Sequence, residues 1–176
     1  IIPFAVPRAV LDHCCDLAQQ QEVLQVAPFT PKRVGLIATT LPGLKAGVVR
    51  KTAEVLQKRL SDCGSTLVEN CLVPHEETAV ADAMIRIGPS VDLLILFGAS
   101  AMTDRRDVLP VAIEQAGGRV LHFGMPVDPG NLLLIGSVRG TPLIGAPGCA
   151  RSPKENGFDW VLHRVMANIP VTRADI

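Results

Sequence analysis

Hydrophobic and polar positions follow two different periods along the chain, and the change from one period to the other predicts strands and helices in turn. Short apolar runs bounded by polar residues or glycine are typical of strands buried on both faces. Longer stretches with apolar residues three and four positions apart are typical of amphipathic helices. The predicted strands are 33–40, 66–73, 93–97, 119–123, 132–138 and 142–145.

Four helices are predicted between and after these strands. They are 46–60, a helix opened by 74–77 and ended by Gly88, a helix after Asp107 ended by Gly117, and a last helix that starts at Ser152. For the last helix, Ser152 and Glu155 have the spacing of a capping box, with Pro153 at the first helical position. The resulting order, β-α-β-α-β-α-β-β-β-α, predicts an α/β fold with a mostly parallel sheet and helices on both faces.

Residues 1–30 have a weaker pattern. Val10, Cys14 and Leu17 lie at helical spacing, which predicts a short helix after Pro7. A metal site at His13-Cys14-Cys15 is one interpretation, but adjacent cysteines on one helix cannot both ligate the same ion comfortably, so we expect packed, buried side chains there. We divide the chain into an extension or linker at 1–30, a main domain at 31–170 and the start of a following linker at 171–176.

Composition narrows the class of protein. The 176 residues suffice for one domain with a proper core, and with 3% aromatic residues and no Tyr that core must be built from Val, Leu, Ile and Ala. The formal net charge is zero, which argues against a nucleic-acid-binding surface. No apolar run is long enough to cross a membrane, no signal peptide is present, and the five cysteines have no regular spacing, so we expect a cytoplasmic protein.

Candidate ligand-binding residues lie in the loops that follow the predicted strands. If the first three strands are parallel, the loops 39–43, 74–77, 98–107 and 146–152 lie along one edge of the sheet, where ligands of α/β proteins bind. The last of these loops leads into a helix start, which favours an anion. The alternative is that Pro147-Gly148 is only a turn and Ser152 only a cap.

The loop after strand 93–97 is the richest in charge. Gly98-Ala99-Ser100 permits close approach of a ligand, and the charged cluster 104–107 follows. Asp104 and Asp107 can hold a divalent cation, with Arg105 or Arg106 meeting a phosphate. The alternative makes Asp107 a helix cap and leaves the arginines solvated. We interpret the loop as a site for a polar, anionic small molecule.

For two further residues the sequence leaves two roles open, one in ligand chemistry and one in packing or local structure. Cys149 is either a reactive thiol or a small packed side chain, and His75 is either a pocket residue or the start of a helix.

These loops together resemble a known family. From about Arg33 to Ala167 the sequence is similar to the molybdopterin-binding domain of molybdenum cofactor biosynthesis, found in molybdopterin adenylyltransferases, molybdotransferases and gephyrin. The matching motifs are Ala38-Thr39-Thr40, the acidic turn Pro74-His75-Glu76-Glu77, Gly98-Ala99-Ser100 through Arg105-Arg106-Asp107, Pro129-Gly130-Asn131, and Ala146-Pro147-Gly148-Cys149-Ala150.

The resemblance is closer to one architecture within the family. FGASAMTDRRDVLP, GMPVDPGN and GAPGCARSPKENGFDWVL resemble the central domain of larger bacterial fusion proteins, in which a nucleotidyltransferase domain similar to molybdenum cofactor cytidylyltransferases follows. The chain opens on Ile1, not Met, so we expect a fragment of a longer polypeptide.

The resemblance implies a three-layer α/β/α sandwich, often trimeric, that binds molybdopterin or molybdenum cofactor. In catalytic members, acidic residues and Mg²⁺ support adenylyl transfer or metal insertion. The implied ligand-binding residues are Thr39, Thr40, Gly98, Ala99, Ser100, Asp104, Arg105, Arg106, Asp107, Pro129, Gly130, Asn131, Pro147, Gly148, Cys149, Ala150 and Ser152. Three positions depart from the family pattern, because His75 replaces a common aspartate, Ala99 a glycine and Cys149 an asparagine.

Three functional hypotheses follow. In the first, the domain binds the pterin and presents it to a nucleotidyltransferase domain of the same polypeptide. In the second, the domain is itself a transferase in which Asp107 and Glu76 bind Mg²⁺. In the third, it is a vestigial domain kept for homo-oligomerisation as a trimer or dimer, with the fold but no ligand.

Overall fold

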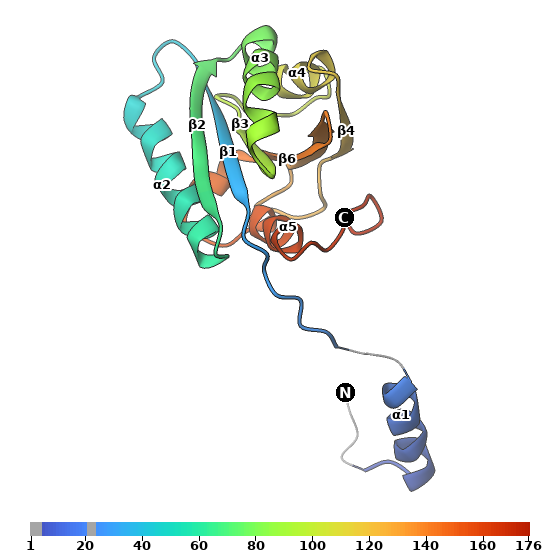
Figure 1. The fold of residues 1–176 in the computed structure, drawn as a ribbon. Coiled ribbons are helices and arrows are strands. Elements are labelled where there is room, and N and C mark those ends of the chain that lie inside the picture. Colours follow the sequence, from blue (N-terminus) through green and yellow to red (C-terminus); the bar gives the residue numbers. More distant parts are fainter. Residues whose placement is uncertain (1–4, 21–23) are drawn as a thin grey trace.

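The computed structural model describes residues 5–20 and 24–176 (Figure 1). The helices are α1 (Arg8–Gln20), α2 (Ala46–Asp62), α3 (Glu77–Ile87), α4 (Val108–Gln115) and α5 (Gly157–Met166), with short 3-10 helices η1 (Gly88–Ser90) and η2 (Gly148–Arg151). The strands are β1 (Arg33–Thr40), β2 (Thr66–Pro74), β3 (Leu93–Phe97), β4 (Gly118–Phe123), β5 (Leu134–Val138) and β6 (Thr141–Ala146). All six predicted strands and the predicted helices are therefore present.

The six strands form one mixed sheet in the order β2-β1-β3-β6-β5-β4. Neighbouring strands from β2 to β6 are parallel, whereas β5 is antiparallel to both β6 and β4. Only β5 therefore runs against the rest, because the tight turn at Arg139-Gly140 between β5 and β6 can join only antiparallel strands.

Two hydrophobic clusters, one on each face of the sheet, form the core. On one face Leu56 and Leu60 of α2 and Phe158 and Leu162 of α5 pack together. On the other, buried residues of α3 and α4 pack against alternate residues of the same strands, which include Ile37, Leu94 and Leu96. The predicted three-layer α/β arrangement, with a mostly parallel sheet between helices, is confirmed (Figure 1).

The predicted start of the last helix is wrong. Helix α5 begins at Gly157, and its capping box consists of Asn156 and Asp159, not of Ser152 and Glu155. Asn156 Oδ1 accepts a hydrogen bond from Phe158 N (3.1 Å), and Asn156 N donates to Asp159 Oδ2 (2.9 Å). The Ser152 hydroxyl instead accepts from Lys154 N in a local turn. Both Ser152/Glu155 and Asn156/Asp159 have the residue types of a capping box. The second pair forms the box, because Asp159 also has a buried partner elsewhere in the fold, Arg59.

The expectation of buried cysteines near the N-terminus is also wrong. Helix α1 forms as predicted, but every residue in it is exposed, including Cys14 and Cys15. The helix is amphipathic, yet no residue within the described part of the chain covers its apolar side. No helix in the described residues has the length and apolar character needed to span a membrane.

Candidate functional site

The candidate site lies at the carboxyl edge of the parallel strands. The register pairs Thr40 with Pro74, Ala38 with Phe97, and Phe97 with Ala146, so β1, β2, β3 and β6 end at the same level. The four loops predicted to converge therefore do so. Strand β4 runs in the same direction, so the loop 124–133 also begins at this edge.

A hydrogen-bond chain joins three of these loops. His75, which follows β2, lies with Nδ1 2.8 Å from Thr39 Oγ1 of β1 and Nε2 2.8 Å from Ser100 Oγ, which follows β3. The backbone N–H of Ala99 also donates to Thr39 Oγ1 (2.7 Å). Thr39 is buried, whereas Ser100 is exposed at the outer end of the chain.

The surroundings of His75 determine whether its ring is charged and which ring nitrogen carries the proton. Burial lowers the pKa of His75, with Asp107 acting weakly in the opposite sense, so the ring is neutral near pH 7. A neutral ring donates from one nitrogen and accepts at the other. If Nδ1 donated to Thr39, the Thr39 hydroxyl would have to donate to Phe97 O, which is 3.5 Å away and too distant for a strong bond.

The distances therefore favour the other tautomer. Thr39 donates to Nδ1, and Nε2–H donates to Ser100 Oγ. Ser100 then keeps its own hydroxyl proton for a group outside the protein. The Thr39–His75–Ser100 hydrogen-bond chain thus presents the Ser100 hydroxyl as a donor at the edge of the sheet. Such a donor suits an anionic oxygen.

Arg151 joins the fourth loop to the same place. Its guanidinium donates to Gly98 O (2.6 Å) and lies 5.2 Å from the centroid of the Phe97 ring. Partial burial lowers the pKa of Arg151, which still remains charged at neutral pH. The contact connects η2 to the end of β3, directly before the loop that carries Ser100.

The charged cluster after β3 is largely occupied with its own backbone. Asp107 Oδ2 accepts from the N–H groups of Thr103 (2.6 Å) and Asp104 (2.9 Å), and these bonds lower the pKa of Asp107. Asp107 stands at the N-cap position of α4, but its carboxylate makes no cap bond to that helix. The prediction that Asp107 caps α4 is therefore right about the N-cap position. It is wrong about the side chain, because the carboxylate accepts from the N–H groups of the loop 103–107 and not from those of the helix.

The two arginines of this cluster have partners outside the His75 hydrogen-bond network. Arg106 Nε donates to Asp104 Oδ1 (3.1 Å), which raises the pKa of Arg106 and lowers that of Asp104. Arg105 lies 5.9 Å from the ring centroid of Phe123 at the end of β4. Neither has a contact with Thr39, His75 or Ser100, although both stay predicted ligand residues.

The turn 129–131 lies against the start of α5. Pro129 O accepts from Gly157 N (3.1 Å), and Gly130 has φ +131° with the Gly157 backbone 2.8 Å from where a Cβ would stand. Glycine is therefore required at 130 by both conformation and space. This packing fixes the end of the 146–156 segment.

Cys149 is part-buried in η2 and has a long contact to Asn156 Oδ1 (4.0 Å). Burial raises the pKa of its thiol, and Asp128 acts in the same sense, so it is protonated at neutral pH. Of the two alternatives for Cys149, a packed thiol fits these surroundings better than a reactive one.

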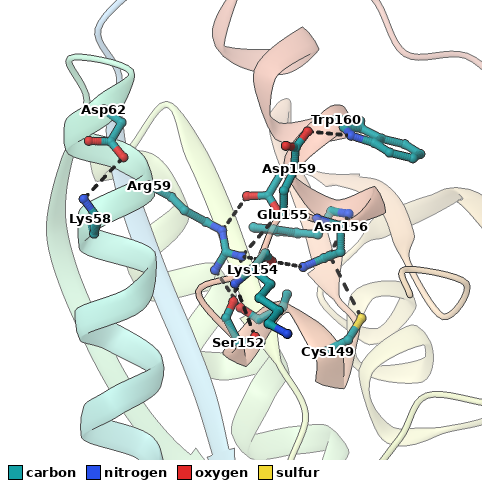
Figure 2. Close-up of polar contacts among 12 residues, drawn as sticks. Lys58, Arg59, Asp62, Cys149, Ser152, Lys154, Glu155, Asn156, Asp159 and Trp160 are labelled. Atoms are coloured by element: carbon teal, nitrogen blue, oxygen red, sulfur yellow. Dashed lines mark hydrogen bonds and ion pairs between the residues drawn. The ribbon is translucent and has the colours of Figure 1, made fainter. Parts of the chain in front are cut away.

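One buried arginine holds the 148–156 segment in place (Figure 2). Arg59 of α2 pairs with Asp159 and donates to the carbonyl oxygens of Ala150 (2.7 Å) and Ser152 (2.8 Å). The side chains of Arg59 and Asp159 are only 10% and 8% exposed. The donor fork of Arg59 thus satisfies carbonyls that the irregular backbone leaves unpaired.

Two hollows open at the carboxyl edge. One of about 350 Å³ is lined by Thr40, Leu41, Pro42, Pro74, His75 and Glu76. The other, of about 220 Å³, is lined by Val48, Lys51, Thr52, Arg151 and Ser152. A larger cavity of about 440 Å³ lies elsewhere, between α2 and α5, next to the Arg59–Asp159 pair.

The predicted magnesium ligands do not form a cluster with further donors. Among residues 5–20 and 24–176, no three His, Cys, Asp or Glu side chains are grouped so that they could hold a metal ion. Glu76 is exposed at the start of α3, and its backbone, not its carboxylate, contributes the helix contact to Val80.

The structure thus joins some predicted residues and separates others. Thr39, Ala99 and Ser100 share one hydrogen-bond network with His75, and Gly98 accepts a separate bond from Arg151. Asp104 to Asp107 and Pro129 to Asn131 belong to neighbouring loops with their own contacts. Sequence reasoning left His75 undecided and missed Arg151 and Lys51. For Arg151 the sequence did give a signal, because it lies inside the predicted loop 146–152, between the predicted ligand residues Ala150 and Ser152.

Comparison with solved structures identifies similar folds. The chain is similar to a molybdopterin biosynthesis MoeA protein from Pyrococcus horikoshii, with 21% identity and a TM-score of 0.50 over 78% of this chain and 34% of that one. This chain thus spans about a third of that protein. It is also similar to the molybdopterin biosynthesis enzyme MoaB from Thermus thermophilus, with 16% identity and a TM-score of 0.56 over 78% and 94% of the two chains.

A third similar structure is the protein CinA of unknown function from Thermoplasma acidophilum, with 19% identity and a TM-score of 0.55 over 80% and 100% of the two chains. No family model and no curated protein matches the sequence. At these identities the likeness establishes the fold, an α/β domain of the MoaB type with a mixed six-stranded sheet.

Proposed function

We propose that this domain binds molybdopterin, or the molybdenum cofactor made from it, during cofactor biosynthesis. The observation that carries the proposal is the Thr39–His75–Ser100 chain, which leaves a free hydroxyl proton on Ser100 at the carboxyl edge. A terminal phosphate on a pterin is an acceptor of the kind that this donor suits. The sequence resemblance and the similar MoeA and MoaB folds support the choice of pterin among phosphorylated ligands.

The hollow beside His75 supplies room next to this donor. Leu41, Pro42 and Pro74 give it apolar walls, and His75 and Glu76 give it polar ones. Its volume of about 350 Å³ is that of a small-molecule pocket, for which roughly 300–1,000 Å³ is usual. A flat heteroaromatic ring with polar edges matches such a lining.

The test is a fluorescence titration of the purified chain with molybdopterin under reducing, oxygen-free conditions. Saturable binding is expected, with Ser100→Ala weakening it roughly 10- to 100-fold, the worth of a hydrogen bond to a charged group. Ser61→Ala is the matched control, because Ser61 is an exposed serine of α2 whose hydroxyl bonds to Gln57, far from the His75 network. Absence of binding by the folded chain, or equal affinity of the two variants, overturns the proposal.

The transferase alternative assigns Mg²⁺ to Asp107 and Glu76, beside the separate possibility of a cation at Asp104 and Asp107. Turnover of molybdopterin with ATP and Mg²⁺ that disappears in Asp107→Asn would favour this alternative over a binding role. The bonds that Asp107 Oδ2 and Asp104 Oδ1 already make to their own loop favour the binding role.

The next step of the proposal concerns the neighbouring domain. We propose that the bound pterin is presented to a nucleotidyltransferase domain of the same polypeptide, an idea supported by the sequence resemblance alone. In the full-length protein, Ser100→Ala should then raise the KM for the pterin and leave the KM for the nucleotide unchanged. The vestigial alternative predicts a trimer or dimer by light scattering together with no pterin binding.

A further inference from the structure

The smaller hollow at the carboxyl edge has a composition that differs from the rest of the site. It lies between the start of α2 and the end of η2, and Val48, Lys51, Thr52, Arg151 and Ser152 line it. We propose that this hollow is a separate anion subsite that takes a phosphate group. The proposal goes beyond the pterin site, because it does not depend on Ser100 or on the identity of the rest of the ligand.

The first argument is charge. Two of the five lining residues, Lys51 and Arg151, are cations, and none is acidic. No ion pair involves either of them within the described residues 5–20 and 24–176. By contrast, α2 residues Arg50, Lys58 and Arg59 each have a carboxylate partner.

The second argument is the cost of leaving Arg151 as it is. The guanidinium is partly withdrawn from water against the Phe97 ring, and within the described part of the chain it donates to the neutral oxygen of Gly98. A partly desolvated cation without a counter-charge is unfavourable, and its lowered pKa reflects this cost. An anion placed between Arg151 and Lys51 would supply the missing counter-charge and offset the desolvation cost of Arg151.

The third argument is size and direction. The volume of about 220 Å³ falls below the roughly 300–1,000 Å³ of pockets that enclose a whole ligand. The hollow therefore suits a single phosphate group and not a complete larger ligand. Val48 belongs to the first turn of the 17-residue helix α2, where the helix dipole adds positive potential. The planar donor fork of Arg151 fits phosphate oxygens, and Lys51 adds a point charge.

The test is a titration of the ¹⁵N-labelled chain with inorganic phosphate, followed by amide chemical shifts at constant ionic strength with chloride as the reference anion. Saturable shifts are expected at the amides of the lining residues. Lys51→Gln should weaken phosphate binding about tenfold, the scale of one charge-assisted contact. Arg50→Gln is the control, since it removes the same charge from the next position of α2, where the side chain pairs with Glu54.

Further variants separate this proposal from the pterin site and from misfolding. The shifts at the lining residues should saturate at the same phosphate concentration in Ser100→Ala as in the wild type, because Ser100 does not line this hollow. Arg151→Lys keeps the charge and should bind phosphate more weakly than the wild type, whereas Lys51→Gln, on an exposed helical position, keeps the test valid if Arg151 variants unfold. Equal loss in Lys51→Gln and Arg50→Gln, or shifts that do not saturate, would overturn the subsite.

Discussion

At the scale of single residues, the site is organised by two side chains whose roles depend on what surrounds them. His75 is a bridge because burial keeps its ring neutral between two hydroxyls. Arg59 has a carboxylate partner in Asp159, whereas Arg151 of the same region has none among residues 5–20 and 24–176. The environment of each side chain, more than its type, therefore separates a structural residue from a candidate ligand.

The lowered pKa of His75 makes stability depend on pH. The unfolded chain has a His pKa of about 6.5, so between the folded-state pKa and that value the unfolded state binds more protons. The free energy of unfolding should rise with pH through this window, be fully developed above about pH 6.5 and decline as pH falls through the folded-state pKa. Urea unfolding of the wild type and His75→Gln across this range measures the effect.

The matched comparison cancels the other histidines, because His13, His122 and His163 are present in both proteins. His75→Gln should show a shallower dependence on pH than the wild type. Identical slopes for the two proteins would contradict the neutral, bridging His75.

Removing the buried arginine should be costly. Arg59→Ala leaves Asp159 buried without its partner and unpairs two carbonyls, so a loss of about 3–5 kcal/mol of unfolding free energy is expected. Arg59→Lys should recover only part of this loss, because an ammonium cannot reproduce the planar fork. Chemical denaturation measures both.

The neighbouring Lys58 provides the control. Its pair with Asp62 is exposed, and Lys58→Ala should therefore cost less than about 1 kcal/mol. Similar losses in Arg59→Ala and Lys58→Ala would show that Arg59 does not hold the 148–156 segment.

At the scale of elements, the segment before α5 shows how a helix start is chosen. Ser152-Pro153 and Asn156 are both good start signals, but only Asp159 of the second box reaches Arg59 across the core. The tertiary pair fixes the later start. As a result, 152–156 remains irregular, and the carbonyl oxygens of Ser152 and Lys154 accept hydrogen bonds from Arg59 of α2.

This choice can be measured with two variants. Asn156→Ala should destabilise the protein by about 0.5–2 kcal/mol, because it removes the cap bond to Phe158 N. Ser152→Ala should change stability by less than about 0.5 kcal/mol, since its hydroxyl bonds only within a local turn. A larger loss for Ser152→Ala in urea unfolding would restore the earlier helix start.

At the scale of the whole molecule, the parallel strands do two things at once. Their apolar side chains bury two cores on opposite faces, and their common direction brings the ends of β1, β2, β3 and β6 to one edge. Residues 39, 75, 100 and 151 are far apart in sequence and meet only because of this register. Helix α1 contributes to neither core.

The loss of stability caused by a substitution should depend on whether the residue belongs to one of the two cores or to α1. Leu96→Ala, in the fully buried centre of β3, is expected to cost about 2–5 kcal/mol. Leu17→Ala, at a position in α1 that is 47% exposed, should change the free energy of unfolding by less than about 0.5 kcal/mol. A large effect of Leu17→Ala would show that α1 packs against another surface in solution.

The sequence by itself determined the elements and the fold class. The uninterrupted run Leu93–Phe97 and the spacing of Val80, Ala83, Met84 and Ile87 reflect burial on both faces of a strand and on one face of a helix, which is local information. Even the convergence of loops followed, because strand direction follows from helix-containing crossovers.

Tertiary structure alone decided which side chains meet at that edge. The His75 bridge, the turn of Asp107 into its own loop, and the contact of Arg151 with Gly98 depend on ångström-scale register between distant strands. The choice of Asn156 over Ser152 depends on Arg59, about a hundred residues away in sequence. Periodicity reports which face of an element is buried, but hydrogen bonds and charge pairs depend on distances and angles that only the packed molecule sets.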